Sequence, residues 1–261
     1  MTQTPPFEII GQSRKGRWLV TCDHASNYVP EDIWPEGGEA LGLPPADMSR
    51  HIAYDIGARG VALALAQHLD SPAILSRFSR LVIDPNRGAD DPTLVRKIYD
   101  GSIIPGNRNA GASEIARRID GYYRPYHDAY ERLAQQRDDT VILAVHSFTP
   151  QLKSRPRRPW QIGILSAHDK RLTDPLIKAL EQAPTLVAEA TKIGERLCIG
   201  DNEPYEGRFP GDSIDQHALR KGRLNVLVEL RSDLIETPEA QSHWASLLAP
   251  ILCDALAKTD L

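Results

Sequence analysis

The sequence is poor in cysteine. Its 261 residues include only Cys22, Cys198 and Cys253, which are far apart and odd in number. This pattern argues against a disulfide framework and against a zinc knuckle built from cysteines. Cys22 lies two residues before a histidine. Because cysteine is among the most buried residue types, we expect a structural thiol there rather than a reactive one.

An excess of charge of one sign and long hydrophobic runs are also missing. The chain has 31 basic and 35 acidic residues, which give a formal net charge of −4. This balance gives no electrostatic reason to expect nucleic acid or an anionic membrane as a partner. No apolar run approaches the length of a membrane span, and residues 1–10 do not resemble a secretory signal. We therefore expect a cytoplasmic protein.

Short apolar runs alternate with amphipathic stretches along the chain. The predicted strands are residues 18–20, 73–75, 81–83, 140–145, 160–165 and 225–228. The predicted helices are 51–69, a helix from 112 to 133, one with Asp174 as N-cap, and a closing helix capped by Thr237. This order predicts one α/β domain over residues 1–261. We expect a three-layer arrangement, in which helices cover both faces of a mixed, mostly parallel sheet.

Three polar stretches are predicted to be loops. They comprise residues 31–50, 88–110 and 200–223, all rich in Gly, Pro and acidic or amide side chains. Long loops in compact domains are often functional. The composition of residues 200–223 fits an active-site lid and a merely solvated loop equally well.

Polar residues follow four of the apolar runs, at the point where each run ends. They are His24, the pair Asn86 and Arg87, His146, and the segment Glu229-Leu230-Arg231. The carboxyl ends of parallel strands meet at one edge of a sheet, where α/β proteins usually bind ligands. We therefore expect these side chains to share one site, although a single histidine of this kind is more often a hydrogen-bonded structural residue.

Two imidazoles suit a borderline-soft divalent ion such as zinc. A catalytic zinc site has three protein ligands and an open position for water. With His24 and His146 as two ligands, a carboxylate is the expected third, and the candidates are Asp55, Glu31 and Asp23.

The other strand-end residues have expected roles around that metal. Glu229 is the candidate general base, and Arg87, helped by Asn86, could hold a substrate carboxylate through its two-pronged donor geometry. Arg231 is interpreted equally well as a second substrate anchor or as an ion-pair partner of Glu229 or Asp233.

Several motifs, taken in order, resemble the N-formylglutamate amidohydrolase family. They are DHASNYVP, HIAYDIGA, SRLVIDPNRGADDP, VHSFTP, RPWQIGIL, GDNEPYEG and VELRSDLI, and they extend from about residue 20 to 235. This family is similar in turn to zinc carboxypeptidases and aminoacylase-like deacylases. The resemblance implies a zinc-exopeptidase-like (phosphorylase/hydrolase-like) fold and one Zn2+ per chain. It also implies metal ligands at His24 and His146, substrate contacts from Asn86 and Arg87, and a catalytic Glu229.

The match departs from the carboxypeptidase pattern at one ligand. Carboxypeptidases place an acidic ligand three residues after the first histidine, where this sequence has Asn27. The HIAYDIGA stretch implies that Asp55 supplies the charge instead. The expected activity is hydrolysis of the C–N bond of an N-formyl or other small N-acyl amino acid, most plausibly an acidic one. The alternatives are a zinc peptidase or amidase of other acyl specificity, and a non-catalytic binder of carboxylated metabolites.

Overall fold

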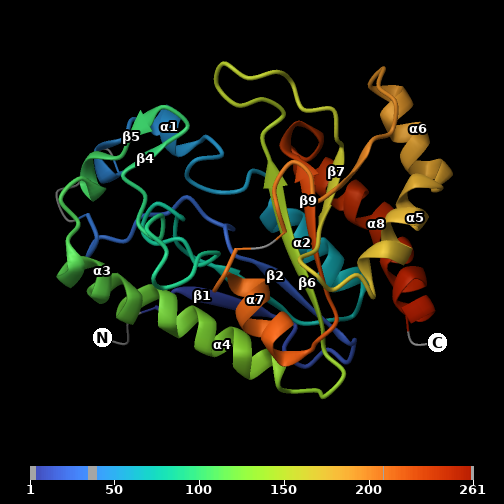
Figure 1. Ribbon diagram of the computed structural model, residues 1–261, viewed down its shortest axis with the longest axis horizontal. Helices are drawn as coiled ribbons and strands as arrows, with labels where there is room; N and C mark the ends of the chain where they lie inside the picture. The colour runs from blue at the N-terminus through green and yellow to red at the C-terminus, as the bar shows by residue number, and fades with distance from the viewer. Residues whose placement is uncertain (1–3, 35–39, 208, 260–261) are drawn as a thin grey trace.

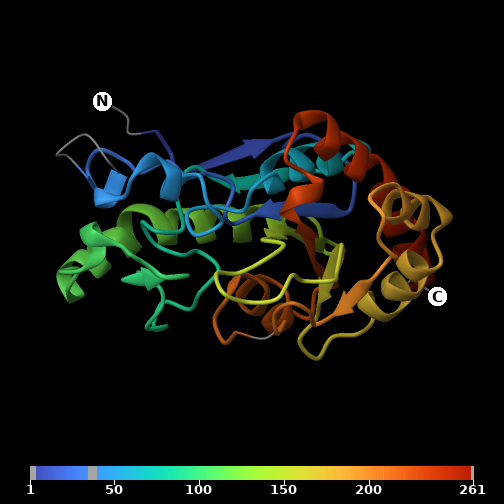
Figure 2. The same cartoon turned by 90° about the horizontal axis from the view of Figure 1, so that it is seen from above.

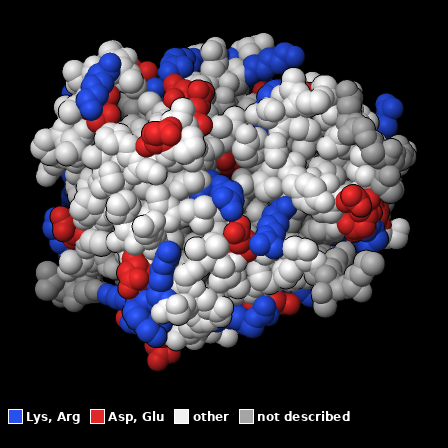
Figure 3. Space-filling view, turned by 180° about the vertical axis from the view of Figure 1, so that it is seen from behind, with Lys and Arg blue, Asp and Glu red and all other residues white. Residues whose placement is uncertain are grey.

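The structure is a computed structural model that describes residues 4–34, 40–207 and 209–259. The two ends of the chain lie on opposite sides of the molecule (Figure 1). Among the described residues, no helix combines the length and apolar character needed to cross a membrane. Acidic and basic side chains are interspersed on the face shown in Figure 3, in keeping with the nearly balanced composition.

A seven-stranded sheet forms the centre of the protein, in the order β1-β3-β2-β6-β9-β7-β8 (Figure 1). Strands β3, β2, β6 and β9 run parallel, β1 is antiparallel to β3, and β7 is antiparallel to β9 and parallel to β8. The strands are β1 (Phe7–Ile10), β2 (Trp18–Cys22), β3 (Ala73–Ser76), β6 (Val141–Phe148), β7 (Ile162–Leu165), β8 (Ile199–Asp201) and β9 (Asn225–Arg231).

Helices cover both faces of this sheet, which confirms the predicted three layers (Figure 2). Along β6, Leu143 and Val145 pack in the core beneath α2 and α8, whereas Ile142 and Ala144 pack beneath α4 and α7. Burial on both faces explains why the strands read as continuous apolar runs. The helices are α2 (Ala58–His68), α4 (Arg124–Ala134), α5 (Thr173–Glu181), α6 (Pro184–Lys192), α7 (Ser213–His217) and α8 (Pro238–Thr259).

A separate apolar cluster lies beside the sheet, on the left of Figure 1. It joins α3 (Ala112–Arg118) to short elements of the predicted loops. These elements are η1 (Ala40–Gly42), α1 (Pro45–Met48), β4 (Ile98–Tyr99), β5 (Ser102–Ile103) and η2 (Pro105–Asn107). A π-helical turn, η3 (Ile119–Tyr123), connects α3 to α4, so the predicted helix from residue 112 is confirmed with one widened turn.

One predicted strand is wrong. Residues 81–83 form turns rather than a strand, and their side chains are fully buried in the cluster beside the sheet, with Phe78 and Leu94. A short apolar run is equally compatible with a second core and with a buried strand. Asn86 and Arg87 therefore follow a buried loop and not a strand end.

Two helix starts differ from the prediction. The helix predicted over 51–69 begins at Ala58, because Gly57 has a φ of 78° that stops the helix from extending toward residue 51. Helix α5 begins at Thr173, so Asp174 lies inside it rather than at its N-cap. The closing helix is capped as predicted, since the Thr237 hydroxyl accepts a hydrogen bond from the backbone N–H of Ala240 at 3.2 Å.

The loop predictions are only partly right. Residues 200–223 contain α7 and a short helix, η4 (Leu219–Lys221), and a further one, η5 (Ser232–Leu234), follows β9. Residues 35–39 of the first predicted loop lie outside the described residues.

Candidate active site

Three polar side chains emerge at the carboxyl edge of the parallel strands. His24 lies two residues beyond the end of β2, and His146 and Glu229 lie near the ends of β6 and β9. Strand β6 pairs with both β2 and β9, so the three strand ends are neighbours. The parallel order of the sheet thus gathers residues that are up to 205 positions apart in the sequence.

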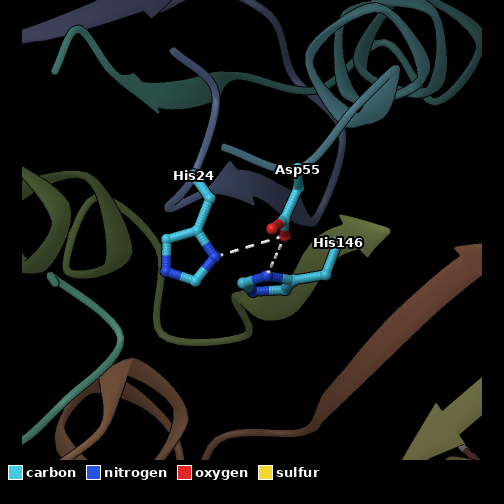
Figure 4. Close-up of side chains that lie close together, drawn as sticks. All are labelled: His24, Asp55 and His146. Carbon is cyan, nitrogen blue, oxygen red and sulfur yellow. Dashed lines mark hydrogen bonds and ion pairs between the residues drawn. The ribbon is translucent and has the colours of Figure 1, made fainter. Parts of the chain in front are cut away.

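Asp55 completes a compact cluster with the two histidines (Figure 4). One of its oxygens, Oδ2, lies 3.2 Å from Nδ1 of His24 and 2.8 Å from Nδ1 of His146. Asp55 reaches this position from the turn that precedes α2, and its backbone N–H donates to the carbonyl of His24 at 2.9 Å. Among the described residues these three form a group able to hold a metal ion, with ligand atoms within 4.8 Å of one another.

The second nitrogen of His24 is fixed by another carboxylate. Nε2 of His24 lies 2.8 Å from Oδ1 of Asp84, and the guanidinium of Arg80 donates to Oδ2 of Asp84 at 2.7 and 3.1 Å. Because an ionised carboxylate only accepts, Nε2 of His24 carries the proton in this pair. Nδ1 of His24 faces the ionised Asp55 in the same way, so a metal ion bound there would replace the proton on Nδ1.

His146 has a comparable neighbour behind it. Its Nε2 lies 3.8 Å from Oδ2 of Asp23, and neither atom has a hydrogen-bond partner among the described residues. The other oxygen of Asp23 accepts the hydroxyl of Tyr126 at 2.5 Å. Asp23 therefore lies behind a histidine of the cluster, whereas Asp55 lies between the two histidines.

The charges in the cluster shift its pKa values strongly. Burial alone would raise the pKa of Asp55, but the positive charges and hydrogen bonds of the two histidines lower it instead. Burial disfavours protonated His146, yet the hydrogen bond and charge of Asp55 raise its pKa to about 9. Asp84 remains ionised despite its burial, because Arg80 holds its pKa well below the usual range. The site thus concentrates negative charge around the two imidazoles.

Glu229 faces the same cavity as the cluster. It is 6% exposed, and its Oε2 has no hydrogen-bond partner among the described residues. Burial raises the pKa of this carboxyl to about 7, against the opposing charge of His146. A carboxylate of that basicity is suited to accept and return a proton near neutral pH.

The cavity above these residues has an empty volume of about 760 Å³, part of it open to solvent. Asn86 and Arg87 line it together with the cluster and Glu229. The Arg87 guanidinium stacks on Phe209 at 4.6 Å, and no ion pair joins it to a carboxylate in the part of the chain that the structure describes. The cavity therefore contains the Arg87 guanidinium, whose N–H donors are available to a ligand, together with the three residues that could hold a metal.

Arg231 is not part of this site. Its side chain is 1% exposed and pairs with Glu195 at 2.8 and 3.0 Å and with Asp233 at 2.8 Å, away from the cavity lining. The structure thus shows Arg231 in ion pairs, which was one of its two interpretations. Its partners are Asp233, as predicted, and Glu195 instead of Glu229. Two other residues discussed from the sequence also lie elsewhere. Glu31, a candidate metal ligand, is exposed in a separate groove. Asn27, at the position of the acidic ligand in carboxypeptidases, was not a candidate and donates to the carbonyl of Met48 at 2.9 Å.

Sequence reasoning missed several residues of the site. Arg80 and Asp84 are not among the site residues predicted from the sequence, although together they orient His24. Their signal is the SRLVIDPNR motif, in which Arg80 and Asp84 are four residues apart. The cavity lining also includes His51, Tyr99, Phe148, Tyr205, Phe209 and Asp212. These residues come from loops and a strand end with no periodic signal, so only the fold reveals them.

The residues present fit a zinc ion. Two imidazole nitrogens and one carboxylate oxygen form a donor set typical of catalytic zinc, and all three are buried. The contact from Asp84 to the far nitrogen of His24 is the outer-sphere carboxylate that commonly orients a metal-bound histidine. Asp23 lies behind His146 in a similar place, but its Oδ2 is 3.8 Å from Nε2, beyond hydrogen-bond distance.

Comparison with known proteins places the chain in a family. Residues 16–236 match the family model of N-formylglutamate amidohydrolase. The chain is 24% identical over 218 residues to an N-formylglutamate deformylase of Pseudomonas putida, covering 76% of this chain and 73% of that protein.

Two solved structures are similar. A gene product of Agrobacterium tumefaciens is 30% identical, with a TM-score of 0.88 and coverage of 99% of this chain and 97% of that one. An N-formylglutamate amidohydrolase from Ralstonia eutropha is 19% identical and shares the fold, with a TM-score of 0.64 over 97% of this chain and 98% of that one. The family match covers most of the sequence. This chain therefore belongs to the N-formylglutamate amidohydrolase family, and it is a hydrolase of amide C–N bonds.

Proposed function

We propose that the protein is a zinc-dependent amidohydrolase that removes a formyl or other small acyl group from an N-acyl amino acid. The observation that carries this proposal is the buried group of His24, Asp55 and His146, with ligand atoms within 4.8 Å of one another. The negative charges of Asp55, Glu229 and Asp23 raise the pKa of His146, and they would also favour a divalent cation between the imidazoles. One ion per chain is expected.

In this proposal the metal is held by Nδ1 of His24, Nδ1 of His146 and the carboxylate of Asp55. A bound zinc ion supplies an acidified water and polarises the scissile carbonyl. Asp84 keeps the proton of His24 on Nε2, so that Nδ1 stays available as a ligand.

Glu229 moves the proton in this mechanism. Its carboxylate accepts a proton from the attacking water as the water oxygen bonds to the acyl carbon. It then delivers that proton to the leaving nitrogen as the C–N bond breaks. The products are the carboxylic acid and the free amino group. Burial of Glu229, which raises its pKa to about 7, supports this dual role, because a weaker base would not hold the proton between the two steps.

Arg87 is assigned to the substrate carboxylate, with Asn86 beside it in the cavity lining. A guanidinium can bind a carboxylate through two parallel hydrogen bonds, which fixes both the position and the orientation of the substrate. The absence of an ion pair on Arg87 among the described residues supports this role.

Metal analysis tests the proposal. Protein purified without chelator should contain about one zinc per chain, and His24→Ala and His146→Ala should each lose it. His243→Ala is the control, because His243 is an exposed residue of α8 that pairs with Glu189 of α6 and does not line the cavity. Wild-type protein that stays free of metal after zinc is added, yet binds N-acyl amino acids, would favour the non-catalytic binder instead.

A further inference from the structure

The segment Pro85–Arg87 belongs to no helix or strand, but side chains from other parts of the fold hold its backbone by hydrogen bonds. The carbonyl of Pro85 accepts hydrogen bonds from Nε2 of His127 at 3.0 Å and from the hydroxyl of Ser213 at 3.2 Å. The carbonyl of Arg87 accepts the hydroxyl of Tyr123 at 2.8 Å. The backbone on both sides of Asn86 is therefore tied to buried side chains from elsewhere in the fold.

The three donors are themselves buried and come from two separate elements. Tyr123 and His127 belong to the continuous helix η3–α4, each with 6% exposure, and Ser213 is the first residue of α7 with 0% exposure. We call Tyr123, His127 and Ser213 the bracket. Figure 1 shows α7 lying against α4, which is where the bracket residues meet.

Side chains of α7 tie the bracket together from behind. Gln216 donates from Nε2 to the hydroxyl of Tyr123 at 2.8 Å, and Nε2 of His217 lies 2.8 Å from Nδ1 of His127. Because a carbonyl only accepts, the proton of His127 in the contact with Pro85 is on Nε2, and its Nδ1 faces His217. His217 contacts Glu131 through its other nitrogen at 2.9 Å. The bracket thus ends on a fixed carboxylate rather than in solvent.

The side chain of Arg87 is held much less than its backbone. Its guanidinium donates to the carbonyl of Asn86 at 2.6 Å and stacks on Phe209. The position of the guanidinium in the cavity consequently depends on where the backbone of Pro85–Arg87 lies. A displacement of this backbone by a fraction of the hydrogen-bond length would misalign a two-pronged contact with a carboxylate.

We propose that the bracket residues Tyr123, His127 and Ser213 are positioning residues, which set Arg87 for recognition of the substrate carboxylate. This inference rests on the proposed function, since it takes Arg87 as the carboxylate-binding group. It predicts that loss of a bracket contact weakens the binding of carboxylated substrates and leaves the hydrolytic step nearly intact.

Tyr123→Phe is the sharpest variant, because it deletes one hydroxyl and keeps the ring. Tyr122→Phe is its matched control. Tyr122 is also 6% exposed, but its hydroxyl donates to Asp32, which lines a different groove. Both variants are assayed on an N-formyl amino acid and on the same compound with its carboxylate replaced by a carboxamide. Melting temperatures of both are recorded, and Ser213→Ala serves as a second bracket variant.

Tyr123→Phe should raise KM for the carboxylate substrate about tenfold and change kcat by less than about twofold. KM for the carboxamide should stay close to that of the wild type. Ser213→Ala should move in the same direction, and Tyr122→Phe should not. Equal effects on the two substrates, or an effect of Tyr123→Phe no larger than that of Tyr122→Phe, would overturn the proposal.

If the wild-type protein hydrolyses neither substrate, the proposed function is wrong. The role of the bracket can then still be tested by binding. Calorimetry then measures binding of N-acetylglutamate to the wild type and to both tyrosine variants. Weaker binding by Tyr123→Phe alone, by about tenfold, would support the bracket. Equal binding by all three proteins, or no binding by the wild type, would overturn it.

Discussion

His146 and Glu229 are register partners on the neighbouring parallel strands β6 and β9. Their side chains project from the same face of the sheet, next to each other and into the same cavity. His146 contacts Asp55 through Nδ1, and Oε2 of Glu229 has no hydrogen-bond partner among the described residues. The sheet thus places a candidate metal ligand beside a candidate base without any loop between them.

Replacing that base should separate turnover from metal binding. Glu229→Gln keeps the shape of the side chain but cannot accept a proton, so we expect kcat to fall by about 10²- to 10⁴-fold. The zinc content of the variant should remain near that of the wild type, because Glu229 is not among the three expected ligands. Steady-state kinetics and elemental analysis on the same preparation check both points. Wild-type turnover in Glu229→Gln would rule out the general-base role.

Asp84 should control the affinity of the site for metal. In Asp84→Asn the charge that orients His24 is lost, and we expect zinc affinity to fall by about 10- to 100-fold. Competition with a chromophoric chelator measures this. The control is Asp47→Asn, since Asp47 pairs with the partly exposed Arg50 away from the cluster. If Asp84→Asn and Asp47→Asn bind zinc equally well, Asp84 has no such role.

Two arginines that looked similar in the sequence should behave differently. Arg87→Met should raise KM for a carboxylate substrate strongly and leave the free energy of unfolding nearly unchanged, because no ion pair joins Arg87 to a described carboxylate. Arg231→Met leaves Glu195 and Asp233 without their buried partner. It should therefore lower the free energy of unfolding by about 2 kcal/mol, since the two carboxylates are partly exposed and keep Arg157 as a partner. Urea denaturation beside kinetics distinguishes the two, and the reverse pattern would exchange their roles.

The contribution of His127 to the stability of the protein should decrease as the pH falls below 6.5. Burial, with His217 beside it, lowers the pKa of His127 from 6.5 to about 3. The unfolded chain takes up this proton near pH 6.5 and the folded chain only near pH 3, so stability is lost as pH falls through that range. Between pH 6.5 and 5 the expected loss from this group is about 2 kcal/mol.

Urea unfolding at several pH values checks this dependence, with His127→Gln as the comparison. The variant cannot take up a proton at that position, so on going from pH 6.5 to 5 its free energy of unfolding should rise by about 2 kcal/mol relative to that of the wild type. Burial raises the pKa of Glu131, but hydrogen bonds from Arg223 and His217 lower it to about 2. Glu131 therefore affects stability only at lower pH. A variant with the same slope as the wild type would contradict the assignment to His127.

Local sequence patterns determined much of the fold because they reflect local physics. Buried strands such as β6 and β9 appear as β-branched apolar runs, and the helix from residue 112 appears as apolar residues three or four apart. The same patterns could not tell residues 81–83 from a strand, since burial in a second core and burial in a sheet require the same side chains.

The sequence also determined which residue types end the strands, and its local patterns alone were enough to indicate His24, His146 and Glu229. Those local patterns could not choose among Asp55, Asp23 and Glu31, for which only the family-like HIAYDIGA motif favoured Asp55, nor between the two interpretations of Arg231. Those choices depend on distances between segments far apart in the chain. Only the tertiary structure, with β2, β6 and β9 paired in parallel, places Asp55 between the two histidines and Arg231 against Glu195, because tertiary packing sets which charges meet.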